Sequence, residues 1–525
     1  MAETVARQIA HWAQTQPDGV AYLDGSTPLT WGEYDAASSR LAAFLAQNLK
    51  LDRGDRVALV LPDGPGVHIA LVACEKAGLV AAGIGPRAGR QEIEHLLGVT
   101  GARALLSRPV HQDLVMAELV ADLQASGHPV AHHLAVEDEL RQSGEFGERP
   151  TTTKPPPPLR PLASDELFLL NSTSGTTGMP KCVTHDQDRW LAFHELAVPR
   201  GRLTHSDIFM SVVPAPFGFG IWTSHVTPTL LGVPCVVMPR FEAEEALALI
   251  EEHRVSVLAA VSTQFIMMLE AHGSRERDLS CLRVLFTGGE AVPYERAVEF
   301  EEQTGARVLQ FYGSNETGAV SATSLDDKRE ARLRTAGRPI PEMNLRLFDE
   351  EGHDVTARGR GRPGCRGPTL SRGYFGSGEE VAEANRELIR SDGWMMLGDL
   401  VVLDGDGYLT VVGRIDDFII RGGKNISGPA IEEQVSRHPA VALAAAVAMP
   451  DPVFGERVCV YVELRPGEES LGLEDLLEDL LTRGVSKETL PERLVVLETL
   501  PRGSGGKVAK QVLREDIRSR LAEED

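Results

Sequence analysis

The strongest constraint on the fold is an alternation of short apolar runs with helical runs in the first hundred residues. Residues 56–61 form an apolar run that stops at Pro62-Asp-Gly, as expected of a buried strand. Residues 67–78 have the pattern of a helix that ends at a glycine, and residues 79–85 supply the next strand. Strand–helix–strand alternation of this kind predicts a doubly wound α/β layer.

The alternation continues beyond a polyproline run at 151–158, which is typical of a stiff surface connector. Further apolar strands are expected at 254–260, 282–287 and 307–311. The pattern changes after about residue 399, where a hairpin is predicted over 401–412. A helix at 429–437, strands at 442–448 and 457–464 and acidic helices follow. We therefore predict an N-terminal domain over 1–413 and a smaller α+β domain over 414–525.

Composition narrows the class of protein. The 525 residues include 53 Lys and Arg against 76 Asp and Glu, a net charge of −23, which argues against binding to nucleic acid or to anionic lipid. No apolar run approaches the roughly 18 residues of a membrane span, and the amphipathic N-terminus does not resemble a signal peptide. Six scattered cysteines favour reduced thiols. A cytoplasmic protein is expected, either a monomer or a homodimer.

The most informative segment is Asn171-Ser-Thr-Ser-Gly-Thr-Thr-Gly-Met-Pro-Lys-Cys182, which follows an apolar strand at 167–170. Its hydroxyl groups and glycines expose many hydrogen-bond donors, for which phosphate oxygens are the natural partners, and Lys181 adds a cation. A Walker-type loop is excluded, because it requires glycine at 180 and serine or threonine at 182, where this chain has Pro180 and Cys182. A polar loop without a ligand remains the alternative from this run alone.

This run resembles the phosphate-binding signature of the adenylate-forming superfamily, which comprises acyl- and aryl-CoA ligases, adenylation domains and luciferases. Four more segments resemble later motifs of that superfamily in the right order. They are Phe311-Tyr-Gly-Ser-Asn-Glu-Thr-Gly318, Leu397-Gly-Asp399, Gly413-Arg-Ile-Asp-Asp417 with Arg421-Gly-Gly-Lys-Asn-Ile426, and Pro501-Arg-Gly-Ser-Gly-Gly-Lys507. Five motifs in order are a specific signal, and they extend from about residue 167 to 510.

The resemblance implies a fold and a set of site residues. The large domain should combine doubly wound sheets with a distorted barrel, and the small C-terminal domain should be mobile. Lys507, Glu316 and Thr176 are implied to be catalytic, with Glu316 and Thr176 holding Mg²⁺, Asp416 acting as the hinge, and Gly422 and Gly423 lining the coenzyme A tunnel. The implied nucleotide contacts are Thr173, Ser174, Gly175, Thr176, Thr177, Gly178, Lys181, Gly288, Gly289, Glu290, Phe311, Tyr312, Gly313, Asn315, Glu316, Asp399 and Arg414.

Several of these residues also make chemical sense without the resemblance. Glu316 follows a strand that ends in a glycine turn, where a carboxylate can hold Mg²⁺ against phosphate oxygens. Asp399 can accept two hydrogen bonds from a ribose diol. Lys507 lies in a loop rich in glycine and serine, which suits a charge that must reach the α-phosphate. Considered alone, each residue has a simpler interpretation: Glu316 as an acid in a loop, Asp399 as an acid in a turn, and Lys507 as an exposed lysine.

The acyl pocket is expected to be formed by Phe217, Gly218, Phe219, Trp222, Gly288 and Ser314. Phe217 stands where many relatives have histidine, and Gly218 stands where aryl-acid enzymes often have asparagine. No charged residue occurs in 214–224, so an amino acid would find no partner for its ammonium there. These residues favour an aryl or related cyclic acid.

The predicted activity is therefore a two-step ligation. ATP and Mg²⁺ activate a small carboxylic acid as its acyl-adenylate, and coenzyme A then displaces AMP. Asn315 replaces the threonine usual before the glutamate of this motif, and it retains a hydrogen-bond donor. An adenylation enzyme that loads an acyl carrier protein is the nearest alternative. A nucleotide-binding module without catalysis would tolerate loss of Lys507 or Glu316, and both are present.

Overall fold

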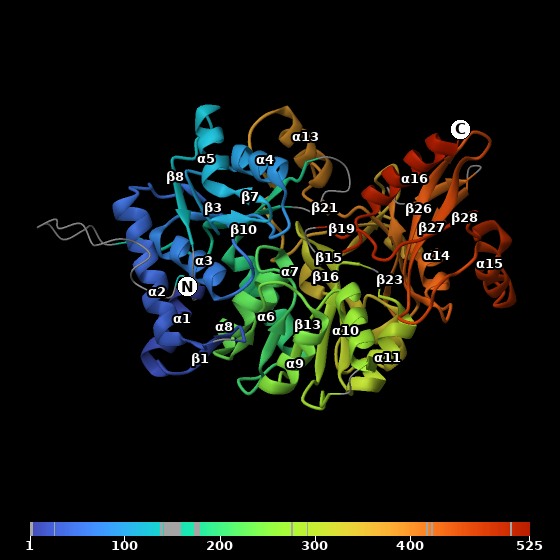
Figure 1. The fold of residues 1–525 in the computed structure, drawn as a ribbon, viewed down its shortest axis with the longest axis horizontal. Coiled ribbons are helices and arrows are strands. Elements are labelled where there is room, and N and C mark those ends of the chain that lie inside the picture. The colour runs from blue at the N-terminus through green and yellow to red at the C-terminus, as the bar shows by residue number, and fades with distance from the viewer. Residues whose placement is uncertain are drawn as a thin grey trace, which may run out of the picture.

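The computed structural model describes residues 4–25, 27–136, 140, 159–172, 179–274, 277–290, 292–415, 418–421, 424–503 and 507–524. These residues form three sheets with their helices in a large N-terminal part, and a fourth sheet with its helices in a smaller C-terminal part (Figure 1). A short ribbon of β6 (Val110–His111) and β7 (Leu114–Val115) completes the described sheet structure. The predicted connector at 151–158 lies outside the described residues.

The first sheet has nine strands in the order β17-β16-β15-β14-β13-β11-β12-β1-β2. Its central strands, from β15 to β1, are parallel, so their carboxyl ends meet at one edge. The strands are β1 (Val20–Leu23), β2 (Leu29–Thr30), β11 (Phe209–Ser211), β12 (Cys235–Val236), β13 (Val257–Ala259), β14 (Val284–Gly288), β15 (Arg307–Ser314), β16 (Gly318–Ala322) and β17 (Arg338–Pro339). The strands predicted at 254–260, 282–287 and 307–311 are confirmed as β13, β14 and β15.

The second sheet has seven strands in the order β20-β10-β9-β4-β3-β5-β8. Five of them are parallel, and β10 and β20 extend that sheet in antiparallel fashion. The strands are β3 (Arg56–Val60), β4 (Val80–Gly83), β5 (Ala104–Ser107), β8 (His132–Ala135), β9 (Leu167–Ser172), β10 (Cys182–Asp186) and β20 (Tyr374–Phe375). The predicted strand–helix–strand unit is confirmed, with α3 (Pro65–Ala77) ending at Gly78 in the left-handed conformation.

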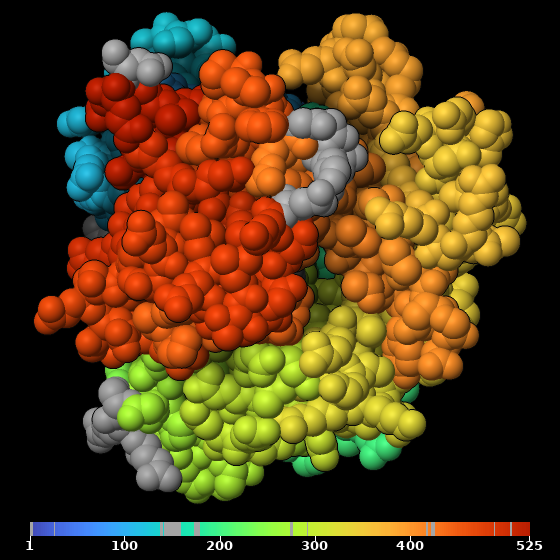
Figure 2. Space-filling model, turned by 90° about the vertical axis from the view of Figure 1, so that its right-hand side faces the viewer, coloured from blue at the N-terminus to red at the C-terminus, as the bar shows by residue number. Residues whose placement is uncertain are grey.

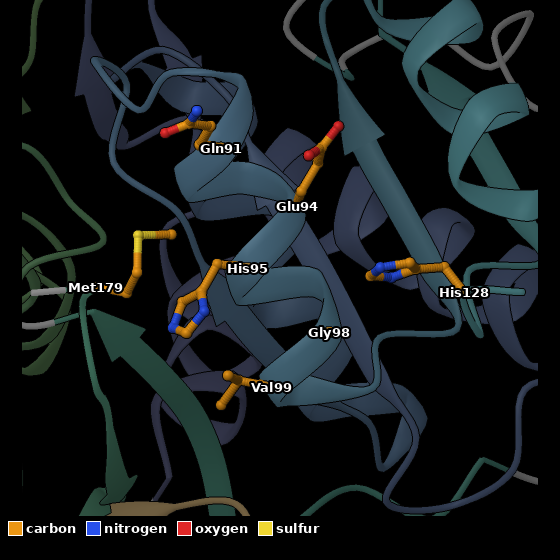
Figure 3. A pocket seen from close by; sticks show the side chains of 7 residues that line it. All are labelled: Gln91, Glu94, His95, Gly98, Val99, His128 and Met179. Atoms are coloured by element: carbon orange, nitrogen blue, oxygen red, sulfur yellow. The ribbon is translucent and has the colours of Figure 1, made fainter. Parts of the chain in front are cut away.

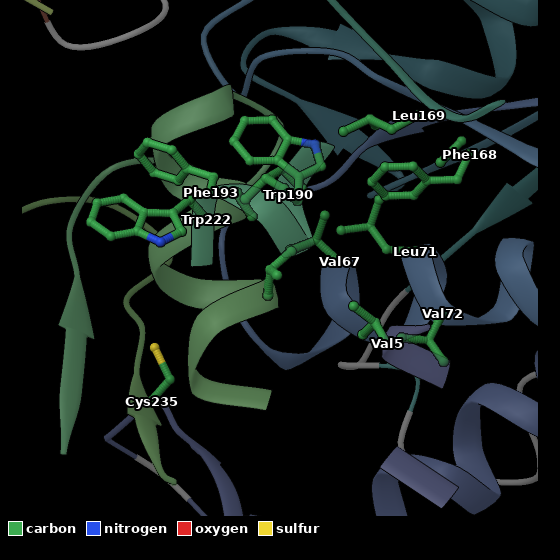
Figure 4. Close-up of a cluster of buried hydrophobic side chains, with 14 of the residues drawn as sticks. Val5, Val67, Leu71, Val72, Phe168, Leu169, Trp190, Phe193, Trp222 and Cys235 are labelled. Atoms are coloured by element: carbon green, nitrogen blue, oxygen red, sulfur yellow. The ribbon is translucent and has the colours of Figure 1, made fainter. Parts of the chain in front are cut away.

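Helices cover both sheets and one buried core joins them. Trp190 and Phe193 of α6 lie beside Trp222 of η3, together with side chains of α3 and β9 (Figure 4). Each fully buried Phe or Leu contributes about 1.5–3 kcal/mol. The helices of this part are α1 (Val5–Thr15), α2 (Trp31–Ala43), η1 (Phe44–Asn48), α3, α4 (Arg90–Thr100), α5 (Met116–Ala125), α6 (Gln187–Gly201), α7 (Gly218–Gly220), η3 (Ile221–Val226), α8 (Thr227–Leu231), α9 (Ala243–His253), α10 (Ser262–Ser274), α11 (Tyr294–Thr304), α12 (Arg329–Arg334), η4 (Pro341–Met343), η5 (Thr356–Arg358) and α13 (Glu379–Leu388).

The third sheet is antiparallel and contains the predicted hairpin. Strand β22 (Asp399–Leu403) pairs with β23 (Leu409–Arg414), which confirms a turn at residues 404–408. The other strands are β18 (Arg346–Phe348), β19 (Arg360–Cys365) and β21 (Met395–Met396). This third sheet has the strand order β18-β19-β22-β23, with β21 paired to β19.

The C-terminal part is a small α+β unit. Its strands are β24 (Phe418–Arg421), β25 (Lys424–Ser427), β26 (Val441–Asp451), β27 (Gly455–Leu464) and β28 (Arg493–Val496), with helices α14 (Gly428–Val435), α15 (Leu473–Thr482), η7 (Lys487–Thr489) and α16 (Lys510–Glu524). It lies against the segment that contains α11 (Figure 2), where Arg437 approaches Glu295 at 3.9 Å. The predicted fold class, a large α/β part followed by a small α+β part, is confirmed.

Two further expectations concern the whole chain. All six cysteines have free thiols, and five of them are buried. Among the described residues, no helix has both the length and the apolar composition needed to cross a membrane.

Candidate active site

Some of the predicted site residues lie outside the described part of the chain. They are Thr173, Ser174, Gly175, Thr176, Thr177 and Gly178 of the hydroxyl-rich run, the hinge residue Asp416, and Gly422 and Gly423 of the coenzyme A tunnel. Their roles remain predictions. Most of the other predicted residues lie at or just after the carboxyl ends of β14 and β15 or on the third sheet. Lys181 directly precedes β10, Lys507 belongs to the C-terminal part, and the pocket residues Phe217, Gly218, Phe219 and Trp222 lie at α7 and η3.

Neighbouring strands β14 and β15 bring two motifs together at one edge of the first sheet. Gly288 pairs with Phe311 in parallel register. A Cβ atom on Gly288 would lie 2.4 Å from the Phe311 carbonyl oxygen, so only glycine fits there. Gly289 has φ of 82°, a left-handed conformation that favours glycine. The two glycines therefore keep the backbone close to the strand ends.

The Glu316 carboxylate lies half-buried in the turn between β15 and β16. The Tyr374 hydroxyl donates to Glu316 Oε1 at 2.8 Å, and Lys181 Nζ lies 5.0 Å from the centre of the Tyr374 ring. Burial raises the pKa of Tyr374, and the Glu316 carboxylate raises it further, so the hydroxyl stays a donor. Among the described residues, the second carboxylate oxygen has no hydrogen-bond donor. An oriented carboxylate of this kind fits a hard cation such as Mg²⁺.

Tyr312 and Asp399 form the next contact of the site. The Tyr312 hydroxyl donates to Asp399 Oδ2 at 2.7 Å, and burial together with the Asp399 carboxylate raises the pKa of Tyr312 well above its ordinary value. Asp399 pairs directly with Arg414 across β22 and β23. The structure therefore brings together Tyr312, Asp399 and Arg414, all three of which were predicted as nucleotide contacts.

Lys507 reaches this edge from the C-terminal part. Its Nζ donates to the Gly289 carbonyl oxygen at 2.7 Å. Burial lowers the pKa of Lys507, and the nearby Glu290 carboxylate opposes that shift. Burial likewise raises the pKa of Glu290, whose Oε1 accepts from the Thr263 N–H at 3.2 Å. Lys507, which follows Gly289 by 218 positions in the sequence, therefore lies at the end of β14.

The lowered pKa of Lys507 predicts the pH dependence of adenylation. The predicted catalytic role of Lys507 requires its protonated ammonium, so kcat/KM for ATP–pyrophosphate exchange should fall as pH rises through the pKa of Lys507 in the free enzyme. That alkaline limb should lie below the ordinary lysine value of about 10.4. Replacing Lys507 by arginine keeps the charge, so the residual activity of that variant should lack this limb. An identical limb in both enzymes would contradict the assignment.

An aromatic cluster lies beside the ends of β14 and β15. We define it as Phe193, Phe219, Trp222, Phe286 and Phe311. The Phe219 ring lies 5.9 Å from Trp222 and 5.0 Å from Phe311, centre to centre, and Phe193 lies 4.7 Å from Trp222. The cluster includes Phe219 and Trp222 of the predicted acyl pocket, and the ring of Phe311, which was predicted as a nucleotide contact. Phe193 and Phe286 were missed, because a phenylalanine in a helix or strand has no signal beyond core packing.

The remaining predicted residues around the pocket differ in their local contacts. A Cβ atom on Gly218 would lie 2.9 Å from Asn315 Oδ1 and 3.1 Å from Trp190 Cη2, so the Asn315 amide occupies the space that a side chain at 218 would need. Phe217 precedes helix α7. The Ser314 N–H donates to Thr317 Oγ1 at 2.9 Å and thereby forms part of the turn that carries Glu316. Gly313 faces the Gly318 carbonyl so closely that a Cβ atom would clash.

Two histidines near the motifs have structural roles. His225 Nδ1 lies 3.2 Å from His68 Nδ1 in the core, and burial lowers the pKa of His225 to about 3. His185 is also fully buried, and burial lowers its pKa well below the ordinary value. Both imidazoles are therefore neutral at physiological pH.

A surface hollow of about 580 Å³ lies beside the segment at Met179 and Pro180 (Figure 3). His95 lines it, and its Nε2 lies 3.1 Å from the Pro180 carbonyl oxygen. The hollow is on the outer side of α4, and the side chains that carry the predicted chemistry do not line it. We assign it no role.

Comparison with known proteins identifies the family. The sequence model of the AMP-binding enzyme family matches residues 9–375, and that of the AMP-binding enzyme C-terminal domain matches residues 430–507. The medium-chain fatty-acid–CoA ligase of Escherichia coli (strain K12) is 31% identical over 98% of this chain and 91% of its own length. The 2,3-dihydroxybenzoate-AMP ligase of Bacillus subtilis (strain 168) is 30% identical over 99% of this chain and 94% of its own length.

The fold has a close counterpart among solved structures. An anthranilate CoA ligase in complex with anthranoyl-AMP superposes with a TM-score of 0.87, at 22% identity and over 99% of this chain and 98% of that one. At 22% identity, this similarity shows the fold alone. Together with the family matches and the relatives aligned over nearly their whole length, it shows that the chain belongs to the AMP-binding enzyme family, within the adenylate-forming superfamily that its motifs resemble.

Proposed function

We propose that this chain is an AMP-forming acid–thiol ligase that joins an aryl or related cyclic carboxylic acid to coenzyme A. In the first step the acid's carboxylate attacks the α-phosphorus of ATP, which forms the acyl-adenylate and releases pyrophosphate. In the second step the thiolate attacks the acyl carbon and AMP leaves. The observation that carries the proposal is the contact of Lys507 with Gly289 at 2.7 Å, which brings the C-terminal lysine to the strand ends.

Each residue at this edge has a role in the adenylation step. The Lys507 ammonium stabilises the negative charge that develops around the α-phosphate in the transition state. Asp399, oriented by the Tyr312 hydroxyl, accepts hydrogen bonds from the ribose hydroxyls. Glu316, oriented by Tyr374, would hold Mg²⁺, which neutralises phosphate charge when bound. Thr176 is the second proposed metal ligand.

The second step needs a different arrangement of the two parts. We propose that Lys507 and the loop of Gly422 and Gly423 occupy the mouth of the site in turn, Lys507 during adenylation and the loop during thioester formation. We propose that the C-terminal domain, residues 414–525, rotates about Asp416 between the two steps relative to residues 1–413. Gly422 and Gly423 then line the path of the pantetheine thiol.

The aromatic cluster supports a flat or cyclic acid. Its Phe311 ring lies beside Gly288, at the strand ends where the acid must meet the α-phosphate. No charged residue occurs in 214–224. The two relatives described above are named for a fatty acid and for an aryl acid, so the substrate class needs a direct test.

We predict that aryl acids stimulate ATP–pyrophosphate exchange more than fatty acids or amino acids do. Burying the unpaired ammonium of an amino acid beside the aromatic cluster would cost several kcal/mol, more than burying a neutral polar group. A panel of carboxylic acids at equal concentration measures the preference. A free amino acid that proves the best substrate by a wide margin would show that the pocket assignment is wrong.

Coenzyme A is proposed as the acceptor, and the phosphopantetheine thiol of an acyl carrier protein is the alternative. The Bacillus subtilis relative is named only as an acid-AMP ligase, which leaves the acceptor of that class open. Release of AMP with free coenzyme A, measured against release with a phosphopantetheine-bearing carrier protein, distinguishes the two. The six free thiols agree with the reducing cytoplasm as the proposed location.

A further inference from the structure

A buried arginine lies directly behind the turn that carries Glu316. Arg189, in the first turn of α6, is 1% exposed. Its Nε donates to the Thr369 carbonyl oxygen at 2.9 Å, and its Nη2 donates to the carbonyl oxygens of Asn315 at 2.9 Å and Glu316 at 3.3 Å. The guanidinium therefore fixes two successive peptide groups of the turn.

The fourth contact of Arg189 begins a chain of hydrogen bonds. Its Nη1 donates to Nδ1 of the neutral His185 at 2.8 Å, which leaves the proton of that imidazole on Nε2. His185 Nε2 then donates to Asn171 Oδ1 at 2.7 Å, and Asn315 Nδ2 donates to the same oxygen at 2.6 Å. We call Asn171, His185, Arg189 and Asn315 the buried polar brace. It links the end of β9 to the turn between β15 and β16.

The brace contains a buried positive charge that no carboxylate contacts directly among the described residues. In the part of the chain that the structure describes, every hydrogen-bond acceptor of Arg189 is a carbonyl oxygen or the neutral imidazole, and no carboxylate forms an ion pair with it. Arg189 also lies at the N-terminal end of α6, where the helix dipole disfavours a cation. Burial lowers its pKa to about 10, so the group remains charged at neutral pH.

Such an arrangement is costly for folding alone. Removing a cation from water without a carboxylate partner is unfavourable, and an apolar side chain of similar volume would often serve stability as well. The free-energy cost of burying the Arg189 cation would serve function if a polyanion binds in front of the turn. The carboxylates of Asp186, the N-cap residue of α6, and of Glu316 both raise the pKa of Arg189. The hydrogen bonds to the Asn315 and Glu316 carbonyl oxygens place the cation behind the proposed metal ligand.

We propose that Arg189 is a positioning residue for MgATP. Through the carbonyl groups of Asn315 and Glu316 it holds the turn that presents the Glu316 carboxylate, and through His185 and Asn171 it couples that turn to β9. This inference rests on the proposed function, because it assigns the Glu316 turn to MgATP. Arg189 itself touches neither substrate nor metal.

The test compares Arg189→Lys with Arg332→Lys in the full chain. Arg332 is also buried, pairs with Glu301, and donates to the Val308 carbonyl oxygen at 2.9 Å, at the opposite end of β15. Both variants should lower the melting temperature. Only Arg189→Lys should raise the KM for MgATP and the half-saturating Mg²⁺ concentration, by about 10- to 100-fold, because misplacing a binding group by about 1 Å has effects of that size. The KM for the acid should change by less than about twofold.

A second variant tests whether the brace acts as one unit. His185→Leu removes the link to Asn171 and keeps the contacts of Arg189 with the turn. In wild-type background it should raise the KM for MgATP, and in the Arg189→Lys background it should add little, because coupled residues are not additive. Full additivity would show that the two residues do not act together.

The outcomes separate this inference from the proposed function. Wild-type ATP–pyrophosphate exchange, with circular dichroism as a check on folding, establishes the adenylation activity. If the wild type is active and folded Arg189→Lys has the same MgATP and Mg²⁺ dependence as Arg332→Lys, the brace proposal alone is overturned. If the wild type neither binds MgATP nor exchanges pyrophosphate, the proposed function and this inference are both overturned.

Discussion

Replacing Lys507 by alanine is expected to lower the rate of acyl-adenylate formation by about two to three orders of magnitude, or about 3–4 kcal/mol of transition-state stabilisation. The variant loses the ammonium that contacts Gly289 at the end of β14. Thioester formation from a supplied acyl-adenylate should remain nearly intact, because in the proposed mechanism Lys507 leaves the strand ends before that step. Separate assays of the two half-reactions measure this difference.

Lys510 provides the matched control. It lies three residues further along the same segment, and its Nζ pairs with Glu432 at 2.7 Å within the C-terminal part. Lys510→Ala should leave both half-reactions close to wild type. Equal loss of both half-reactions in a well-folded Lys507→Ala enzyme would contradict the two-conformation mechanism.

Replacing Glu316 by glutamine should lower kcat/KM by about two to three orders of magnitude, which corresponds to roughly 3–4 kcal/mol. Glutamine keeps the shape and still offers an oxygen to the Tyr374 hydroxyl, so the substitution removes mainly the charge that would bind Mg²⁺. Adenylation kinetics over a range of Mg²⁺ concentrations measure the effect, and the variant should need more metal for half-maximal rate.

A tyrosine–carboxylate pair far from the site provides a control for the general effect of losing a carboxylate that a tyrosine contacts. The Tyr408 hydroxyl donates to Asp327 Oδ1 at 2.7 Å, away from the strand ends that carry the site. Asp327→Asn should therefore keep the Mg²⁺ dependence of the wild type. Wild-type kinetics in Glu316→Gln would return Glu316 to the simpler interpretation, an acid in a surface turn.

The contacts of Arg189 give the proposed metal ligand Glu316 a second support. The proposed metal ligand is oriented by Tyr374 from one side and by a buried guanidinium behind its backbone. Asn315, which differs from the threonine usual at this position, pairs with Asn171 and occupies the space beside Gly218. Two of the departures noted in the sequence, Asn315 and Gly218, thus belong to one set of contacts.

The local structure of this chain was predictable from its sequence. Strands β3, β4, β13, β14 and β15, helix α3 and the β22–β23 hairpin all follow the expected apolar runs and glycine turns. These elements depend on interactions between near neighbours, so their patterns can be read along the chain. The ordered motifs also gave the family, because glycine and acidic residues at strand ends have fixed spacing within each motif.

Contacts between distant segments were decided only by the tertiary structure. Nothing near Glu316 in the sequence indicates that Tyr374 orients it, that Arg189 holds its peptide group, or that Phe193 and Phe286 complete the aromatic cluster. Such contacts depend on how two sheets pack around a shared core, and a tyrosine or arginine has the same local pattern whether or not it reaches the site. The sequence by itself therefore determined the elements and the family, whereas the partners that orient each functional group depended on packing between residues far apart in the chain.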